Sequence, residues 1–121
     1  MNDVNYLKQN GIDADKSICE LGEDMYKEML ELFLSEIADK VNKLRDCLVN
    51  NNMKDYSTYV HGIKGESAYL GFTELVRQAL EHQNKSAEGD TNYISQNYAT
   101  LVQEIQRVIN VVCVFLGRVS A

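Results

Sequence analysis

His61 and Lys64 lie one helical turn apart in the stretch YVHGIKGESAYLG, residues 59–71. An ordinary histidine has a pKa of about 6.5, so at neutral pH most of it is uncharged and a ring nitrogen can attack phosphorus. No carboxylate stands three or four residues from Lys64, where a helix would bring it close enough for an ion pair. An unpaired ammonium one turn from an imidazole is suited to contacting a phosphoryl group.

Small residues surround this histidine on the predicted helix. Gly62 and Gly65 follow it, and Ser57 and Ala68 share its side of the helix. With the apolar stripe taken as the inward direction, His61 lies about 140° away, on the solvent side. Glycine inside a helix costs roughly 1 kcal/mol relative to alanine, so two of them without structural gain indicate a functional surface. We expect them to give clearance for a partner.

The second histidine, His82, has no comparable neighbours, and we expect it to be an ordinary surface residue. The two histidines are twenty-one residues apart, which is not the spacing of two metal ligands on one helix. We therefore predict no metal site.

Composition narrows the possible classes of protein. A chain of 121 residues has the size of one domain, and a formal charge of -6 argues against nucleic-acid binding. The longest apolar run, VINVVCVFLG, is broken by Asn110 and is too short for a bilayer, and the first eleven residues do not resemble a signal peptide. We expect a cytoplasmic monomer without membrane contact, with its three cysteines buried as small apolar residues.

Apolar residues recur at intervals of three and four in three long stretches, and the chain has no proline. This period predicts α-helices. The stripes are Tyr26, Leu30, Phe33, Ile37, Val41, Leu44 and Leu48; Tyr56, Val60, Ile63, Ser67 and Leu70; and Ile94, Tyr98, Leu101, Ile105, Val108, Val112 and Phe115. A shorter helix with Phe72, Leu75 and Ala79 on one side follows the middle stripe.

Short polar connections separate these helices, at residues 50–52 and 86–90, and Gly71 separates the middle helix from the short one. Connections this brief place successive helices antiparallel. The predicted fold is all-α, an up-down-up-down antiparallel four-helix bundle formed by residues 23–118. Residues 1–22 form a capping segment with one or two short helices, one of which starts with Asp13 as its N-cap. We take residues 1–121 as a single domain.

The stretch HGIKGESAYLG resembles the H-x-[LI]-K-G-x-[SA]-x-x-x-G signature of histidine phosphotransfer (HPt) domains. The matching residues are His61, Ile63, Lys64, Gly65, Ser67 and Gly71. The upstream segment GIDADKSICELGEDMYKEMLELFLSEI is similar to the start of these domains. The resemblance covers roughly residues 11–83.

This resemblance implies a four-helix bundle whose exposed histidine carries a phosphoryl group. His61 would accept it from a response-regulator receiver aspartate or a histidine kinase and pass it to another receiver domain. Lys64 would contact the phosphoryl oxygens, and Gly65 would make room for the partner, with Ser57, Gly62 and Ala68 around it. The resemblance also implies that Mg²⁺ belongs to the receiver and that this chain has no cofactor. A phosphocarrier needs no ATP site of its own, and no P-loop sequence is present.

Two positions depart from the family pattern. Glu66 stands where a small residue is usual, which adds negative charge near the site, and Val60 stands where alanine commonly precedes the histidine. Two alternatives stay open. One is the phosphoacceptor domain of a chemotaxis-type histidine kinase, although 121 residues leave no space for an ATP-binding domain. The other is a degenerate adaptor that docks a receiver without transferring phosphate, against which the intact His61 and Lys64 argue.

Overall fold

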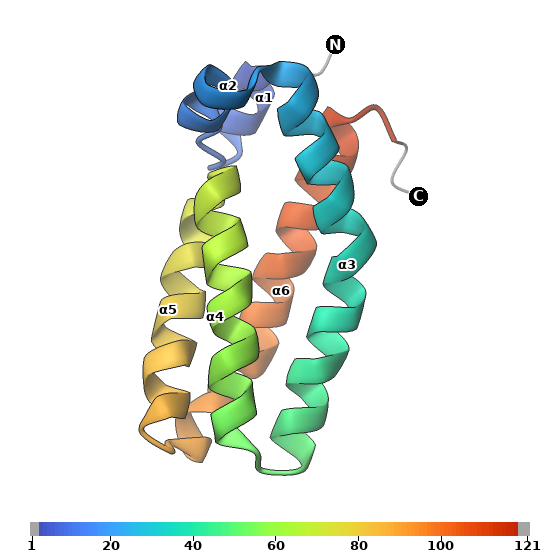
Figure 1. The fold of residues 1–121 in the computed structure, drawn as a ribbon. Helices are drawn as coiled ribbons and strands as arrows, with labels where there is room; N and C mark the ends of the chain where they lie inside the picture. Colours follow the sequence, from blue (N-terminus) through green and yellow to red (C-terminus); the bar gives the residue numbers. More distant parts are fainter. Residues whose placement is uncertain (1–2, 119–121) are drawn as a thin grey trace.

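Four long helices pack side by side in the computed structural model, which describes residues 3–118 (Figure 1). Successive helices run in opposite directions, so the predicted up-down-up-down bundle is confirmed. The four are α3 (Glu23–Val49), α4 (Met53–Leu70), α5 (Thr73–Ala87) and α6 (Thr91–Phe115). Two short helices, α1 (Val4–Gln9) and α2 (Asp15–Leu21), lie across one end of the bundle. The expected domain of 1–121 extends past the described residues at both ends, by 1–2 and 119–121.

The core is built from the inward stripes that the sequence predicts. Most of their members are buried, Val41, Leu48 and Tyr98 are half-buried, and the largest buried ones are completely enclosed. These enclosed side chains include Tyr26, Leu30, Phe33, Tyr56, Ile63, Leu70, Leu75 and Ile94. Phe33 of α3 meets Phe72, the residue before α5, edge to face at 5.0 Å between ring centroids, a favoured aromatic geometry. One apolar core therefore joins all four long helices.

The capping segment is fastened to the end of α4. The backbone N–H of Asp13 donates to the carbonyl of Gly71 at 2.9 Å, and Ile12 and Phe72 form an antiparallel bridge. The hydroxyl of Tyr26 donates to the carbonyl of Leu70 at 2.6 Å. These bonds satisfy carbonyls that the last turn of a helix leaves without an intrahelical partner.

The start of α2 differs slightly from the prediction. Its N-cap is Ala14, one residue later than expected, and Asp13 accepts a bond from the N–H of Asp15 at 3.3 Å. The Asp13 side chain still accepts a bond from an N-terminal N–H of the helix, but its backbone N–H is bonded to the carbonyl of Gly71. Tertiary pairing with α4 has shifted the boundary.

Gly71 ends α4 in the left-handed conformation, with φ +87°. An added Cβ there would stand 1.9 Å from the carbonyl oxygen of Asp13, a backbone atom that cannot move aside freely. Both the conformation and the close approach therefore call for glycine at this position.

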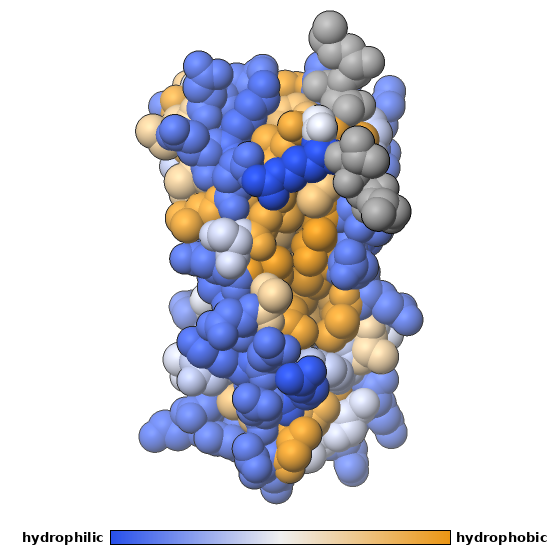
Figure 2. All heavy atoms as spheres, turned by 90° about the vertical axis from the view of Figure 1, so that its right-hand side faces the viewer, coloured by the Kyte–Doolittle hydropathy of each residue, from blue (hydrophilic) through white to orange (hydrophobic). Residues whose placement is uncertain are grey.

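The side of the bundle formed by α3 and α6 shows a strip of hydrophobic side chains between hydrophilic ones (Figure 2). Half-buried apolar residues of these helices include Leu34, Val41, Tyr98 and Ile109. The Tyr98 hydroxyl reaches the carbonyl of Val41 at 3.5 Å. This strip completes the core on a side where the two helices are less closely packed than α4 and α5.

Cysteine exposure differs from the expectation of three buried thiols. Cys47 is buried, but Cys113 is half-buried and Cys19 is exposed on α2. The expectation was wrong for Cys19 because α2 is short and turns only part of its surface toward the bundle. Among residues 3–118, no helix is long and apolar enough to cross a membrane.

We predict that Gly71→Ala lowers the free energy of unfolding by at least the roughly 1–3 kcal/mol typical of a strained backbone conformation. The added methyl group also meets the Asp13 carbonyl oxygen. Urea unfolding followed by circular dichroism measures the loss. Gly89→Ala is the matched control, because Gly89 has φ +77° but nothing within 4 Å of its added Cβ. Equal losses in the two variants would contradict a special packing role for Gly71.

Candidate functional site

Helix α4 has one face in the core and one in solvent. Tyr56, Val60 and Ile63 have no exposed surface, whereas His61 is exposed. A helix turns about 100° per residue, so the inward stripe forces the intervening His61 outward. The exposed surface of α4 that carries His61, Gly62, Gly65 and Ala68 is called the His61 face below. The structure thus places the predicted histidine on an accessible surface.

A glutamine on the neighbouring helix contacts the exposed imidazole. Nδ1 of His61 lies 3.2 Å from Oε1 of Gln83, on α5. Because a carboxamide oxygen only accepts, Nδ1 carries the proton in this pair and Nε2 keeps its lone pair. Ser57 donates its hydroxyl to the backbone carbonyl of Gln83 at 3.3 Å, which ties α4 to this part of α5.

Sequence reasoning missed Gln83. It lies twenty-two residues from His61, and no local pattern connects the two. Only the antiparallel packing of α4 against α5 brings them together. The periodicity of α5 could have placed Gln83 on the side toward α4, but it does not indicate which residue of α4 it meets.

Lys64 is half-buried and lies one turn from His61. Within residues 3–118, no carboxylate oxygen lies within 4.0 Å of its ammonium. The sequence predicts that Lys64 has no ion-pair partner on its own helix. Among the described residues it has none on the neighbouring helices either. Its charge is available to an anionic group brought to the surface.

The two glycines of α4 border open space. An ideal Cβ built on Gly62 or on Gly65 would have no atom within 4 Å. Ala68 is exposed further along the same face, while Ser57 is half-buried and engaged with Gln83. Helix packing therefore does not require glycine at either position, in contrast to Gly71.

Glu66 does not leave a free negative charge beside the histidine, as its sequence position suggested. Its Oε1 accepts a bond from Nζ of Lys40, on α3, at 3.0 Å. The side chain of Glu66 is only 19% exposed, and that of Lys40 is 31% exposed. The carboxylate is thus joined to α3 through this ion pair.

An open hollow of about 310 Å³ lies next to the His61 face at the capping end. It is lined by Asp13, Lys16, Ala68, Gly71, Thr73 and Val76. Leu80, on α5, is 42% exposed on the same flank. The surface beside the histidine therefore offers apolar contact on the α5 side.

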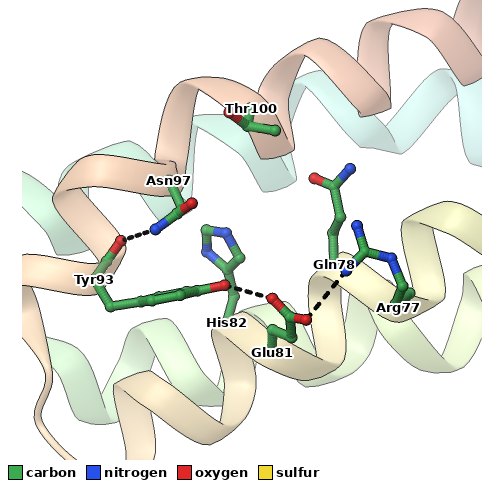
Figure 3. A pocket seen from close by; sticks show the side chains of 7 residues that line it. All are labelled: Arg77, Gln78, Glu81, His82, Tyr93, Asn97 and Thr100. Atoms are coloured by element: carbon green, nitrogen blue, oxygen red, sulfur yellow. Dashed lines mark hydrogen bonds and ion pairs between the residues drawn. The ribbon is translucent and has the colours of Figure 1, made fainter.

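His82 is buried, and the expectation of a surface residue was wrong. It is 2% exposed, and its Nδ1 lies 2.8 Å from the hydroxyl of Tyr56. Figure 3 shows its ring between α5 and α6, beside Tyr93 and Asn97, in a hollow of about 60 Å³. Burial lowers the pKa of His82, and the backbone of Asn97 and the charge of Glu81 offset part of this effect. A polar side chain can occupy this core position because the Tyr56 hydroxyl is its hydrogen-bond partner.

The outer edge of that hollow is a chain of paired polar groups. The hydroxyl of Tyr93 donates to Glu81 at 2.6 Å, which together with burial raises the pKa of Tyr93 to about 12. Arg77 bridges Glu81 and Glu74, and its hydrogen bonds hold the pKa of Glu74 down, at about 2. These groups satisfy one another, and the part of the chain described contains no cluster of three or more potential metal ligands.

Comparison with known proteins identifies the class. The sequence model of the Hpt domain matches residues 28–111, which include the whole of α4. The chain therefore belongs to the Hpt domain family, and it is a phosphorelay intermediate. The chain is similar to the phosphorelay protein LuxU from Vibrio vulnificus strains YJ016 and CMCP6. Each is 25% identical over 88 residues, which span 73% of this chain and 76% of the relative. No solved structure matches significantly. Neither the kinase-domain nor the adaptor alternative is favoured by these matches.

We predict that the bundle loses stability as the pH falls below about 6.5, the ordinary pKa of histidine. Because burial lowers the pKa of folded His82, the unfolded chain takes up this proton first. The free energy of unfolding then decreases with a slope of at most about 1.4 kcal/mol per pH unit from this residue. Urea unfolding at pH 7 and pH 5 should show a smaller difference for His82→Gln than for the native chain.

The matched control is His61→Gln, which removes the exposed imidazole and leaves the Tyr56–His82 pair intact. On acidification, this variant should lose as much free energy of unfolding as the native chain does. An unchanged pH dependence in His82→Gln would contradict the assignment of this loss to the buried ring.

Proposed function

We propose that His61 is the phosphoacceptor of this phosphorelay protein. The observation that carries the proposal is an exposed imidazole whose Nδ1 is held by Gln83, on a helix face cleared by glycine. The donor is a phosphorylated receiver aspartate or a histidine kinase, and the acceptor is a second receiver domain. The chain acts as a carrier and has no ATP site of its own.

The reaction follows from the state of the imidazole. The lone pair of His61 Nε2 attacks phosphorus, the N–P bond forms, and the P–O bond of the aspartyl phosphate breaks with its electrons returning to the carboxylate. Positive charge develops on the ring, and the Nδ1–H bond to Gln83 Oε1 stabilises it. No proton has to be added for the aspartate to leave. Return transfer to another receiver reverses these steps.

Lys64 contacts the phosphoryl oxygens in this proposal. Its position one turn from His61 and its unpaired state within residues 3–118 support the role. An ammonium has most effect where negative charge shifts during transfer. Mg²⁺ belongs to the acidic pocket of the receiver, and this chain supplies no ligand to it.

The His61 face is the docking surface for the partner. Gly62 and Gly65 allow the receiver to approach the imidazole, because no side chain projects from either position. Ala68 extends the surface toward the capping end, and Ser57 supports it through the bond to Gln83. The partner binds as one protein to one carrier chain.

We predict that His61→Gln abolishes acid-labile labelling when the protein is incubated with a ³²P-labelled receiver domain. The reason is that the carboxamide has no nucleophilic ring nitrogen. His82→Gln, checked for folding by circular dichroism, should still be labelled because His82 is enclosed in the core. Labelling of His61→Gln at the native level would refute the assignment.

We predict that Gly65→Gln has opposite effects on stability and on transfer. Helix propensity should raise the free energy of unfolding by something under about 1 kcal/mol, since the site is open. The longer side chain stands one turn from His61 and should reduce transfer sharply by blocking the receiver. Thermal melts and a labelled-receiver assay measure the two effects. Gly65→Ala is the control, because it gains helix propensity while adding a single methyl group.

A loss of stability in Gly65→Gln would place this residue against another helix. Native transfer rates in Gly65→Gln would show that the clearance has no function.

A further inference from the structure

Three charged side chains form a network on the α3 flank of the His61 face. Nζ of Lys40 lies 3.0 Å from Glu66, on α4, and 3.7 Å from Glu36, one turn earlier on α3. The Glu36 side chain is 46% exposed, while Glu66 is only 19% exposed. Two carboxylates share one ammonium, so the network of Glu36, Lys40 and Glu66 carries a formal charge of −1.

This network borders the cleared part of the docking surface. Around the axis of α4, Gly62 and Gly65 lie between His61 and Glu66, by about 100° per residue. Neither glycine has a side chain to separate them, and an added Cβ would meet nothing within 4 Å. A partner that reaches His61 over the glycines therefore also reaches the Lys40–Glu66 pair. A standard interface covers about 800 Å² per partner, which is wide enough to include both.

The residues that α5 contributes to the opposite flank of the docking surface are uncharged, and Lys64 of α4 is the cation on this side. On α5, Val76 is half-buried and Leu80 is exposed, and the neutral Gln83 contacts His61. The surface therefore has an apolar side on α5 and a net negative side on α3. A partner with the matching arrangement can bind in only one orientation.

Structural stability is a weak reason for the network. The Glu36–Lys40 pair, with side chains 46% and 31% exposed, contributes little to folding, because water screens it and the side chains lose freedom. Charges at the rim of an interface act instead on the rate of association and on the choice of partner. We propose that the Glu36–Lys40–Glu66 network selects receiver domains that carry a basic residue facing α3. This inference rests on the proposed function of His61.

The test uses two variants that each remove one negative charge from the network. Glu36→Gln and Glu66→Gln change different side chains on different helices, so a shared effect reports charge and not local packing. Glu23→Gln is the matched control. It removes a carboxylate from an i,i+4 pair on α3, 3.1 Å from Lys27, which lies on the side toward α6.

The probe is the ³²P-loaded receiver domain from the same organism that labels the native chain fastest. We expect both network variants to lower kcat/KM for transfer by roughly three- to tenfold at low salt. The difference should shrink at 0.5 M salt, because screening removes a charge effect. Glu23→Gln should match the native chain. Native rates in both network variants, or a loss that persists unchanged at high salt, would overturn the inference.

Chemical loading separates this inference from the proposed function. Phosphoramidate transfers its phosphoryl group to an imidazole and releases ammonia, with no receiver present. The native chain and both network variants should load equally at His61. Failure of the native chain to load would overturn the proposed function and the inference with it. Equal loading together with unchanged receiver kinetics would overturn the inference alone.

Discussion

Helix α4 must bury its apolar side chains in the core on one side and keep the opposite side exposed. The rest of the structure depends on this separation of the two faces. Tyr56, Val60, Ile63 and Leu70 are fully buried, so they hold α4 between α3 and α5. The period of the helix then turns His61 outward. The same burial fixes which residues of the neighbouring helices lie beside the histidine, because α4 cannot rotate without exposing its apolar stripe.

The three glycines in or directly after α4 have different physical environments. Gly71 ends the helix with positive φ and touches the backbone of Asp13, so it belongs to the fold. Gly62 and Gly65 border open space and cost helix stability without a packing reason. The same signature therefore contains one glycine that the fold requires, Gly71, and one that it does not, Gly65, whose proposed role is partner access. His61 and Gly71, the two ends of this signature, lie only ten residues apart.

The two histidines show how environment separates residues of one type. His61 is exposed and bonded through Nδ1 to Gln83, which leaves Nε2 for the proposed phosphoryl transfer. His82 is enclosed, and Tyr56 occupies its Nδ1. Burial lowers the pKa of His82 and removes the ring from contact with any partner. Its value lies in packing α5 against α4 and α6.

Local sequence determined the features that depend on one helix at a time. The period of the apolar stripes predicted the four long helices and their burial, since a helix of fixed pitch can bury only residues at regular spacing. The same period predicted the exposure of His61, and the short connections predicted antiparallel neighbours.

Only the tertiary structure decided what lies across from each helix. It brought Gln83 to His61, turned Glu66 to Lys40, and buried His82 against Tyr56. None of these pairs shares a local pattern, because their register along the bundle is set by how side chains of different helices fit together. His82 does continue the inward period of Leu75 and Ala79, but its prediction failed because the partner that makes a buried imidazole tolerable lies on another helix. Its helix carries few apolar residues, and a polar ring could join the core only because α4 supplied a hydroxyl at the right height.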